Sequence, residues 1–257
     1  LFQLTMRAVA GIVRTPVHIV GGGPVGLYAS ALLSRFGVPS ILVERYSRGL
    51  RHRRAHLINT RTMELLRELH VEPRVRALAP PQAEWRSFRY CTTLLGEQLA
   101  VDDHLSVPGW NALRAASPTE LTHVSQPGLE RILREEALVL APHAGAMLYF
   151  GYECVGVEQH ADCVRVRLRH ARDTLEGELG AAPCIEAAQL LACDGAGSFI
   201  RQGLGIELRG PPTLQHFRSV HFRDRSGCLA ARLQGRGAML YFVFNSEVNC
   251  TSLQSME

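Results

Sequence analysis

A glycine-rich turn between an apolar strand and an apolar helix constrains this chain more than any other sequence feature. Val17–Val20 is a short apolar run, and Gly21, Gly23 and Gly26 follow it with the spacing GxGxxG. Pro24–Phe36 then carries apolar residues at the spacing of a buried helix. This strand, turn and helix predict the first part of a βαβ unit in a parallel sheet.

The next apolar run completes that unit and ends in an acid. Ile41–Val43 predicts the second strand, and Glu44 follows it, 18 residues after Gly26. An acid at about 20 residues from such a turn accepts hydrogen bonds from a dinucleotide's ribose. The glycines provide a tight turn, close approach to a pyrophosphate and tight helix packing, while the helix start supplies free N–H groups. We therefore predict a dinucleotide site at these strand ends, with Pro24 and Arg45 beside it.

Composition excludes several other kinds of chemistry. All 28 basic residues are arginine, so these residues offer no lysine for a Schiff base or a P-loop. The net charge of +4 comes without a run of like charge and does not predict nucleic-acid binding. Seven cysteines without a CxxC pair predict reduced thiols and no metal site. The longest uncharged stretch, Thr15–Ser34, contains the glycine turn, so we predict no membrane span.

The remainder of the chain predicts a mixture of helices and antiparallel strands. Strand-like alternation after Met147 predicts a meander and not another βαβ unit. Near the end of the chain a second sheet begins, and we expect its Phe242 and Phe244 to lack partner strands. The predicted helices are 59–70, 128–140 and 198–204, and the predicted strands lie within 85–101, 147–158, 163–170, 187–193, 217–222 and 239–244. An irregular stretch that contains Pro108, Gly109 and Pro118 follows the first pair of strands.

Three further segments carry a family resemblance. They are Arg54–Glu64, Ser125–Glu130 and Asp194–Arg201, and they follow the glycine turn in this order. Together with that turn they resemble the FAD-dependent aromatic hydroxylases of the p-hydroxybenzoate hydroxylase and phenol hydroxylase class. The resemblance implies an enzyme with FAD as cofactor, NAD(P)H as co-substrate, and dioxygen as the source of the oxygen atom. It also implies a small phenolic ring as substrate.

The resemblance assigns roles to individual residues. Arg54 contacts the FAD pyrophosphate, because its guanidinium is a permanent cation with fork geometry. Gln126 hydrogen-bonds the ribityl and phosphate region, and Asp194 with Gly195 serves the FAD side of the site. His56 is a candidate catalytic residue, because a neutral imidazole accepts a phenolic proton near pH 7. A solvated basic loop is the alternative for Arg45 and its neighbours, and an ordinary loop histidine is the alternative for His56.

The predicted fold is α/β, with two regions. A Rossmann-like FAD-binding domain with a β-meander comprises residues 16–82 and 118–207, and it is discontinuous in sequence. Residues 83–117 and 208–257 form an incomplete β-rich substrate domain, and residues 1–15 form a leader of unknown role. We expect a cytoplasmic protein, or an organellar one if that leader belongs to a transit peptide. The oligomeric state is not predicted.

The sequence departs from the family's pattern at one important point. The family has a late Gly-Asp pair that binds the ribityl chain, and no glycine is followed by aspartate here. The resemblance covers the amino-terminal half of such an enzyme, and we expect the chain as given to oxidise NADPH without efficient hydroxylation. A truncated, non-catalytic flavoprotein that binds a partner is one alternative. A nicotinamide-dependent dehydrogenase, which shares the glycine turn, is the other.

Overall fold

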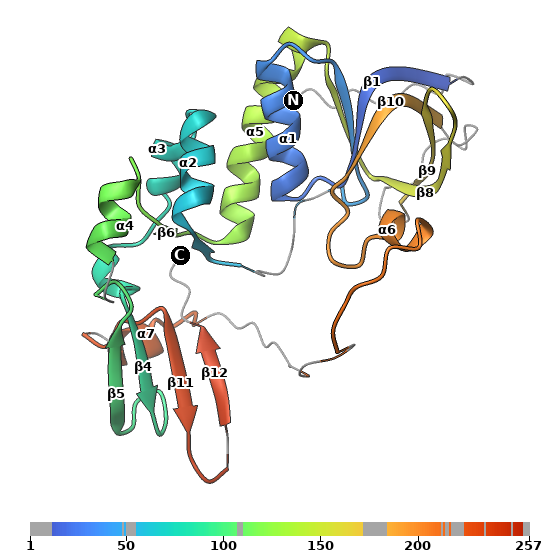
Figure 1. Cartoon of the computed structure of the whole chain (residues 1–257). Helices are drawn as coiled ribbons and strands as arrows, with labels where there is room; N and C mark the ends of the chain where they lie inside the picture. The colour runs from blue at the N-terminus through green and yellow to red at the C-terminus, as the bar shows by residue number, and fades with distance from the viewer. Residues whose placement is uncertain are drawn as a thin grey trace. The chain divides into compact units, whose positions relative to one another are not determined.

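The computed structural model divides into two compact units. Leu1–Arg53 and Gln126–Gln215 form unit 1, and Arg54–Ser125 and His216–Glu257 form unit 2 (Figure 1). This division places 54–82 and 118–125 in unit 2, whereas the sequence analysis assigned both segments to the FAD-binding domain. The structure describes residues 12–47, 49, 55–106, 110–171, 184–211, 213, 216, 224–233, 235–247 and 249–253.

Unit 1 contains a six-stranded sheet whose centre is parallel. The strand order is β7-β2-β1-β10-β9-β8, and the first four strands are parallel to their neighbours, whereas β9 and β8 are antiparallel. The first strand begins at Ile12, inside the segment that the sequence analysis treated as a leader. The strands are β1 (Ile12–Val20), β2 (Ser40–Glu44), β7 (Met147–Phe150), β8 (Tyr152–Gln159), β9 (Val164–His170) and β10 (Cys184–Ala192).

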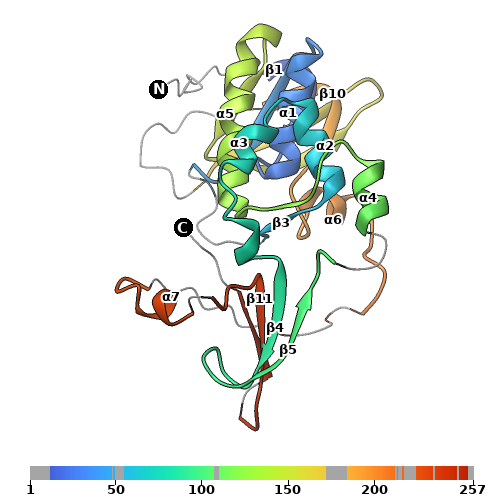
Figure 2. The same cartoon turned by 90° about the vertical axis from the view of Figure 1, so that its left-hand side faces the viewer.

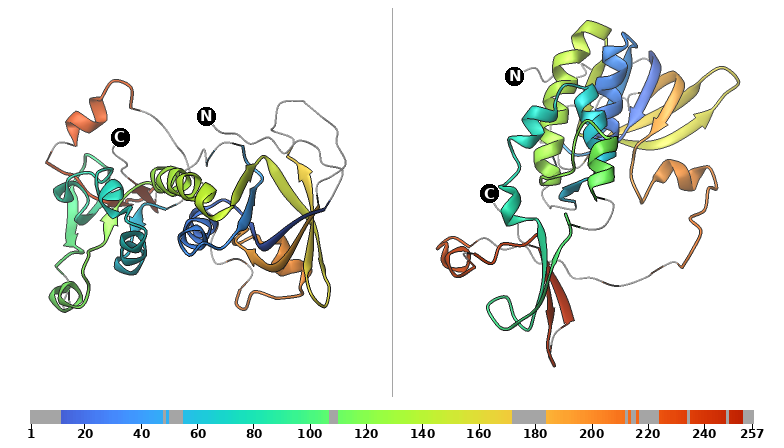
Figure 3. Two further views of the ribbon diagram at one scale, coloured as in Figure 1. Left: turned by 90° about the horizontal axis from the view of Figure 1, so that it is seen from above. Right: turned by 60° about the vertical axis from the view of Figure 1, so that its left-hand side comes forward.

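Two helices lie side by side against this sheet. They are α1 (Pro24–Arg35) and α5 (Gln126–Ala144), which pack on each other and on the parallel strands (Figure 3). Leu27 of α1 and Leu133 of α5 are almost fully buried, so apolar burial holds the pair in place. The predicted α1 agrees with the structure within one residue, and α5 begins two residues before its predicted start.

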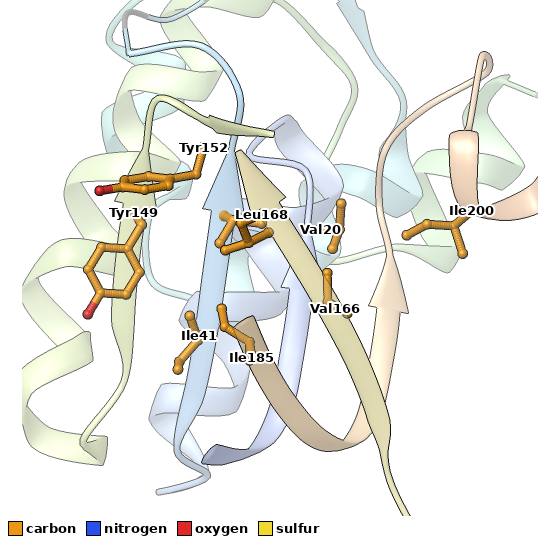
Figure 4. Close-up of a cluster of buried hydrophobic side chains, with 9 residues drawn as sticks. Val20, Ile41, Tyr149, Tyr152, Val166, Leu168, Ile185 and Ile200 are labelled. Atoms are coloured by element: carbon orange, nitrogen blue, oxygen red, sulfur yellow. The ribbon is translucent and has the colours of Figure 1, made fainter. Parts of the chain in front are cut away.

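A hydrophobic cluster fills the space on one face of the sheet. Alternation along β2 places Ile41 and Val43 on this face and Leu42 on the opposite face, which α1 covers. Figure 4 shows the cluster, in which side chains from the parallel strands meet those from the antiparallel strands and from α6 (Phe199–Gly203). Its buried members are Val20, Ile41, Val43, Tyr149, Tyr152, Val166, Leu168, Ile185 and Ile200.

The predicted strand from Met147 to Glu158 is two strands in the structure. Gly151 has a φ of +87°, a left-handed conformation that glycine adopts without strain, and it separates β7 from β8. β7 pairs in parallel with β2, so α5 and β7 extend the parallel part of the sheet. The prediction that the strands after Met147 form a meander and not part of another βαβ unit was therefore wrong for β7. The meander is confined to β8, β9 and β10.

Unit 2 combines short helices with a four-stranded sheet. The strand order is β12-β11-β4-β5, and β11 lies parallel to β4 in Figure 2. The predicted irregular stretch contains a helix, α4, which the sequence analysis missed. The elements are β3 (Leu57–Ile58), α2 (Thr60–Glu68), α3 (Glu72–Arg76), the 3-10 turn η1 (Gln82–Glu84), β4 (Ser87–Cys91), β5 (Gln98–Asp103), α4 (Trp110–Ala116), β6 (Thr122–His123), α7 (Cys228–Arg232), β11 (Leu240–Phe244) and β12 (Asn249–Leu253).

The aromatic residues of β11 have partners, contrary to the expectation from sequence. The ring of Phe242 stacks on Tyr90 with a centroid separation of 5.0 Å, and Phe244 lies 6.4 Å from the same ring. β12 pairs with the other edge of β11, so this strand is hydrogen-bonded on both sides. The expectation failed because it did not include β12 or the pairing of β11 with the distant β4. The predicted strand 217–222 lies outside the described residues.

Candidate functional site

The glycine turn after β1 is packed too tightly to accept a side chain at two of its positions. Gly21 has a φ of +109°, and a Cβ there would lie 2.3 Å from the carbonyl oxygen of Cys193. A Cβ on Gly26 would lie 1.9 Å from the carbonyl oxygen of Gly21. Both atoms belong to backbone that is held in the sheet and turn, so neither can move aside cheaply. These glycines bring the start of α1 directly against the end of β1.

Gly23 differs from its neighbours because it faces open space. A Cβ there would have no described atom within 4 Å. Gly23 is the N-cap of α1 and supplies no side-chain cap, and Pro24 follows at the first helical position. A helix start of this kind offers backbone N–H groups and the positive end of the helix dipole to an anion. Packing among the described residues therefore does not explain this glycine.

Glu44 is fixed beside this turn by two backbone N–H groups. Gly22 donates to Oε2 of Glu44 at 2.6 Å, and Tyr46 donates to Oε1 at 2.9 Å. A Cβ on Gly22 would lie 2.7 Å from the Cβ of Glu44, so this contact also requires a glycine. Each carboxylate oxygen retains a lone pair for a further donor such as a ribose hydroxyl. Gly22 is not among the predicted site residues, although the sequence contains an unbroken run of three glycines here.

Asp194 lies next to the same turn and has a buried oxygen without a partner. Cys193 donates its N–H to the carbonyl oxygen of Val20 at 2.8 Å, which places Asp194 at the end of β1. Its Oδ2 accepts from the N–H of Ile200 at 3.2 Å, whereas Oδ1 is buried and has no hydrogen bond among the described residues. A buried oxygen left in this way is costly unless a ligand or water donates to it. Gly195 follows with a φ of +85°.

The turn after Asp194 is clamped from the helix that follows it. Arg201 donates from Nη1 to the carbonyl oxygen of Ala196 at 2.6 Å. Ser198 caps α6 by accepting from the N–H of Arg201 at 2.9 Å. These two bonds tie the turn to the start of α6. They hold the carboxylate of Asp194 at a fixed place beside the glycine turn.

Gln126 begins α5, the helix that packs along α1. Its Nε2 donates to Oε1 of Glu130, one turn later, at 2.8 Å. Both side chains project from the first turns of the helix, and Glu130 is buried. The amide oxygen of Gln126 remains able to accept a hydrogen bond from a ligand.

Arg134, on the same helix, is a residue that the sequence analysis did not single out. Its guanidinium carbon lies 3.6 Å from the centroid of the Phe150 ring, at the end of β7. Burial lowers the pKa of Arg134, while the nearby carboxylate of Glu44 raises it. The sequence does contain a sign of its position, because Gln126, Glu130 and Arg134 are spaced four residues apart and so share one face of the helix.

Unit 2 contains a pair of histidines, one of which was predicted. The rings of His56 and His123 pack edge to face with centroids 4.9 Å apart, and His123 also stacks on Trp85. His56 Nδ1 and His123 Nε2 are buried without a hydrogen bond among the described residues. Burial, with smaller contributions from His56 and His104, lowers the pKa of His123 to about 4, and burial also lowers the pKa of His56. Both imidazoles are therefore neutral at pH 7.

The structure says less about the two predicted arginines, Arg54 and Arg45. Arg54 lies outside the described residues. Arg45 is exposed, and its guanidinium carbon lies 4.8 Å from the ring centroid of the adjacent Tyr46. The glycine turn, Glu44 and Asp194 come together in unit 1, whereas His56 belongs to unit 2.

The described part of the chain has neither a membrane-spanning helix nor a metal cluster. No helix within the described ranges is long and apolar enough to cross a membrane. The same part of the chain contains no group of three or more His, Cys, Asp or Glu side chains placed to hold a metal ion. The polar groups that gather at the sheet edge are instead backbone N–H groups and carboxylates, which suit a phosphate and hydroxyl groups.

Comparison with known proteins identifies relatives along nearly the whole chain. Residues 14–256 match the family model described as FAD binding domain. The chain is 35% identical over 203 residues to 2,4-dichlorophenol 6-monooxygenase of Cupriavidus pinatubonensis, covering 77% of this chain and 32% of the relative. It is 32% identical over 243 residues to a putative polyketide hydroxylase of Streptomyces halstedii, covering 95% and 41%. The chain thus spans about a third to two fifths of the length of these relatives.

Solved structures give the same result. The flavin-dependent monooxygenase PieE, in complex with FAD and substrate, superposes with a TM-score of 0.75 at 32% identity, over 91% of this chain and 39% of PieE. The rebeccamycin biosynthetic enzyme RebC with reduced flavin gives a TM-score of 0.72 at 25% identity, over 95% and 44%. The fold of this chain is therefore the one found in the corresponding part of flavin monooxygenases.

Proposed function

Because the chain belongs to the family of FAD binding domains, we propose that it supplies the FAD site of an enzyme that hydroxylates a phenolic ring, with NAD(P)H as reductant and dioxygen as oxygen source. Its relatives include a 2,4-dichlorophenol 6-monooxygenase and a phenol 2-monooxygenase, which supports a small aromatic substrate. The cofactor, when bound, supplies the redox chemistry that activates dioxygen. The protein's own residues bind and orient the cofactor and accept the proton of the substrate.

The open position at Gly23 is the observation that carries this proposal. The glycines on either side of it are required by packing, but Gly23 is not. It lies at the uncapped start of α1, where a pyrophosphate is stabilised by backbone N–H groups. Glu44, held by Gly22 at 2.6 Å, then accepts hydrogen bonds from the ribose hydroxyls.

Three further side chains serve the cofactor in this proposal. Asp194 accepts a hydrogen bond at its unpartnered Oδ1, and Gln126 offers an amide oxygen from the start of α5. Arg54 pairs with the pyrophosphate through its guanidinium fork, as the resemblance implies. Asp194 and Gln126 belong to unit 1 together with Gly195 and the start of α1, and this set of donors and acceptors fits a dinucleotide.

His56 takes the phenolic proton. Its pKa is lowered by burial, so the imidazole is neutral at pH 7 and has a nitrogen able to accept a proton. Loss of the proton makes the ring more electron-rich before oxygen transfer. His56 is thereby a candidate catalytic residue.

Flavin binding is tested first. The purified chain is titrated with FAD, and binding is followed by flavin fluorescence and by the visible absorbance of the protein. We expect a yellow protein with one FAD per chain, and Glu44→Ala to weaken binding by about 1–3 kcal/mol, because it removes the acceptor for ribose hydroxyls. A chain that binds NAD(H) and remains colourless would support the nicotinamide-dependent dehydrogenase instead.

Hydroxylation is tested separately. The FAD-loaded chain is incubated with NADH or NADPH and a panel of phenols under labelled dioxygen, and products are identified by mass spectrometry. Incorporation of one labelled oxygen atom into the ring supports the proposed reaction, and His56→Ala should reduce it more than it reduces FAD binding. Flavin binding with NADPH oxidation but without labelled product is the uncoupled reaction expected of the chain as given, whereas flavin binding without NADPH oxidation would favour the non-catalytic flavoprotein.

A further inference from the structure

One side of α5 carries a stripe of polar residues that runs along the helix. Gln126, Glu130 and Arg134 are spaced four residues apart, so they lie on successive turns of one helix face. Gln126 donates to Glu130, which connects the first two members. Arg134 is eight residues from the start of the helix, about 12 Å along its axis. The stripe therefore extends well beyond the residue that the resemblance assigned to the cofactor.

The far end of this stripe meets the ends of two parallel strands. Phe150, the last residue of β7, is the register partner of Glu44 on β2. Both residues lie on the face of the sheet that carries Leu42 and not the hydrophobic cluster, because strand residues alternate between faces. Arg134 reaches this place and lies over the Phe150 ring at 3.6 Å. A cation, an aromatic ring and the proposed ribose acceptor thus gather at one sheet edge.

The guanidinium of Arg134 lacks the polar partners that a half-buried cation normally has. No hydrogen bond or ion pair joins it to another residue within the described part of the chain. Its burial costs free energy that the Phe150 contact and the nearby Glu44 offset only in part. A planar guanidinium in this state can bind another flat group on its second face.

The order of the strands indicates which part of the cofactor would reach this place. The sheet order is β7-β2-β1, and neighbouring strands lie about 4.8 Å apart. With the pyrophosphate at the turn after β1 and the ribose on Glu44 at the end of β2, the next group outward lies beyond the end of β7. In FAD that next group is the adenine ring.

We propose that Arg134 binds the adenine ring of FAD, with the guanidinium plane stacked between Phe150 and the base. This inference rests on the FAD site proposed above and adds the residue that recognises the adenine end. Only two side chains are needed for this stacking, one arginine and one aromatic residue that supports it. It makes Arg134 a determinant of selectivity for FAD over FMN, which lacks the adenosine half.

Flavin titrations of matched variants test the proposal. Arg134→Met removes charge and planarity while keeping length, Arg134→Lys keeps the charge, and Arg131→Met is the control from an exposed position on the same helix. We expect Arg134→Met to weaken FAD binding at least about tenfold and to leave FMN binding unchanged. Arg134→Lys should weaken FAD binding by a smaller factor, and Arg131→Met should change neither affinity.

Each other outcome has a distinct meaning. Unchanged FAD affinity in Arg134→Met, or an equal loss for FAD and FMN, would overturn the adenine assignment while leaving FAD binding intact. A wild-type chain that binds neither flavin would overturn the proposed function and this inference with it. Thermal unfolding without flavin reports whether each variant is folded. If Arg134→Met does not fold, Phe150→Leu removes the supporting ring instead, and unchanged selectivity in that variant would refute the proposal.

Discussion

Alanine substitutions at two glycines of the same turn should affect different properties, namely the stability of the fold at Gly26 and FAD affinity at Gly23. Gly26→Ala places a Cβ 1.9 Å from the carbonyl oxygen of Gly21, so the backbone of the turn must shift. Overpacking usually costs about 1–3 kcal/mol, and an overlap this close with backbone belongs at the upper end of that range or above it. The gain in helix propensity from glycine to alanine returns only about 1 kcal/mol. The free energy of unfolding should therefore fall by about 2 kcal/mol or more.

Gly23→Ala should leave the fold almost unchanged and impair the cofactor site. Its Cβ enters a space with no described atom within 4 Å, and alanine in place of glycine at an N-cap costs only about 0.5 kcal/mol. The same methyl group stands where the pyrophosphate approaches the start of α1. A steric cost of about 2 kcal/mol in the complex corresponds to a roughly thirtyfold loss of FAD affinity.

Chemical denaturation without flavin and FAD titration at equilibrium separate the two effects. Gly203→Ala, at an open helical position with no described atom within 4 Å, serves as the control; it should leave FAD affinity unchanged and raise the free energy of unfolding by no more than about 1 kcal/mol. The reasoning would be refuted if Gly23→Ala retained wild-type FAD affinity, or if Gly26→Ala were as stable as the wild-type chain. A Gly23→Ala variant that lost stability to the same extent as Gly26→Ala would also contradict the packing argument.

Three other substitutions test the remaining groups. Asp194→Ala removes the acceptor for the Ile200 N–H and the unpartnered Oδ1, so FAD binding measured by fluorescence should weaken by about 1–3 kcal/mol, and unchanged affinity would exclude Asp194 from the site. Because the pKa of His123 falls from 6.5 to about 4 on folding, stability is full above pH 6.5 and declines as the pH falls toward 4. His123→Phe, which can keep the stack on Trp85, should reduce the pH dependence of the free energy of unfolding between pH 6.5 and 4, measured by urea denaturation, and an unaltered pH dependence would contradict this assignment. Arg54→Lys keeps charge but loses the bidentate fork, so FAD affinity should fall, whereas equal affinities of the wild type, Arg54→Lys and Arg54→Ala would make Arg54 a solvated loop residue.

Local sequence patterns were sufficient for the first βαβ unit. The three glycines, the helix from Pro24 and the acid after the second strand were all predicted in place, because each depends on neighbours in sequence. A required glycine indicates a special backbone conformation or a close contact, and Gly21 and Gly26 are examples. The family resemblance likewise depended on short segments and was confirmed by the comparison with known proteins.

Strand pairing between distant segments was decided only by the tertiary structure. The sequence gives the alternation around Gly151, but whether β7 joins β2 or β8 depends on where α5 brings it. The same limit explains the wrong expectation for Phe242, whose partner Tyr90 is more than 150 residues earlier in the chain. Hydrophobic periodicity identifies a face and carries no information about which strand will be its neighbour.

The site shows the same division between local and long-range information. Glu44 was predicted because an acid at a set distance from a glycine turn has a known chemical use. Arg134 and His123 were not, because an arginine in a helix and a histidine in a strand are ordinary until folding determines their surroundings. Burial leaves nitrogen atoms of His123 and His56 without described partners, and strand register places Phe150 beside Glu44 under the guanidinium of Arg134. The sequence alone identified residues whose role depends on the local backbone, such as the glycines of the turn and Glu44. The packing of distant segments decided which polar groups became buried together.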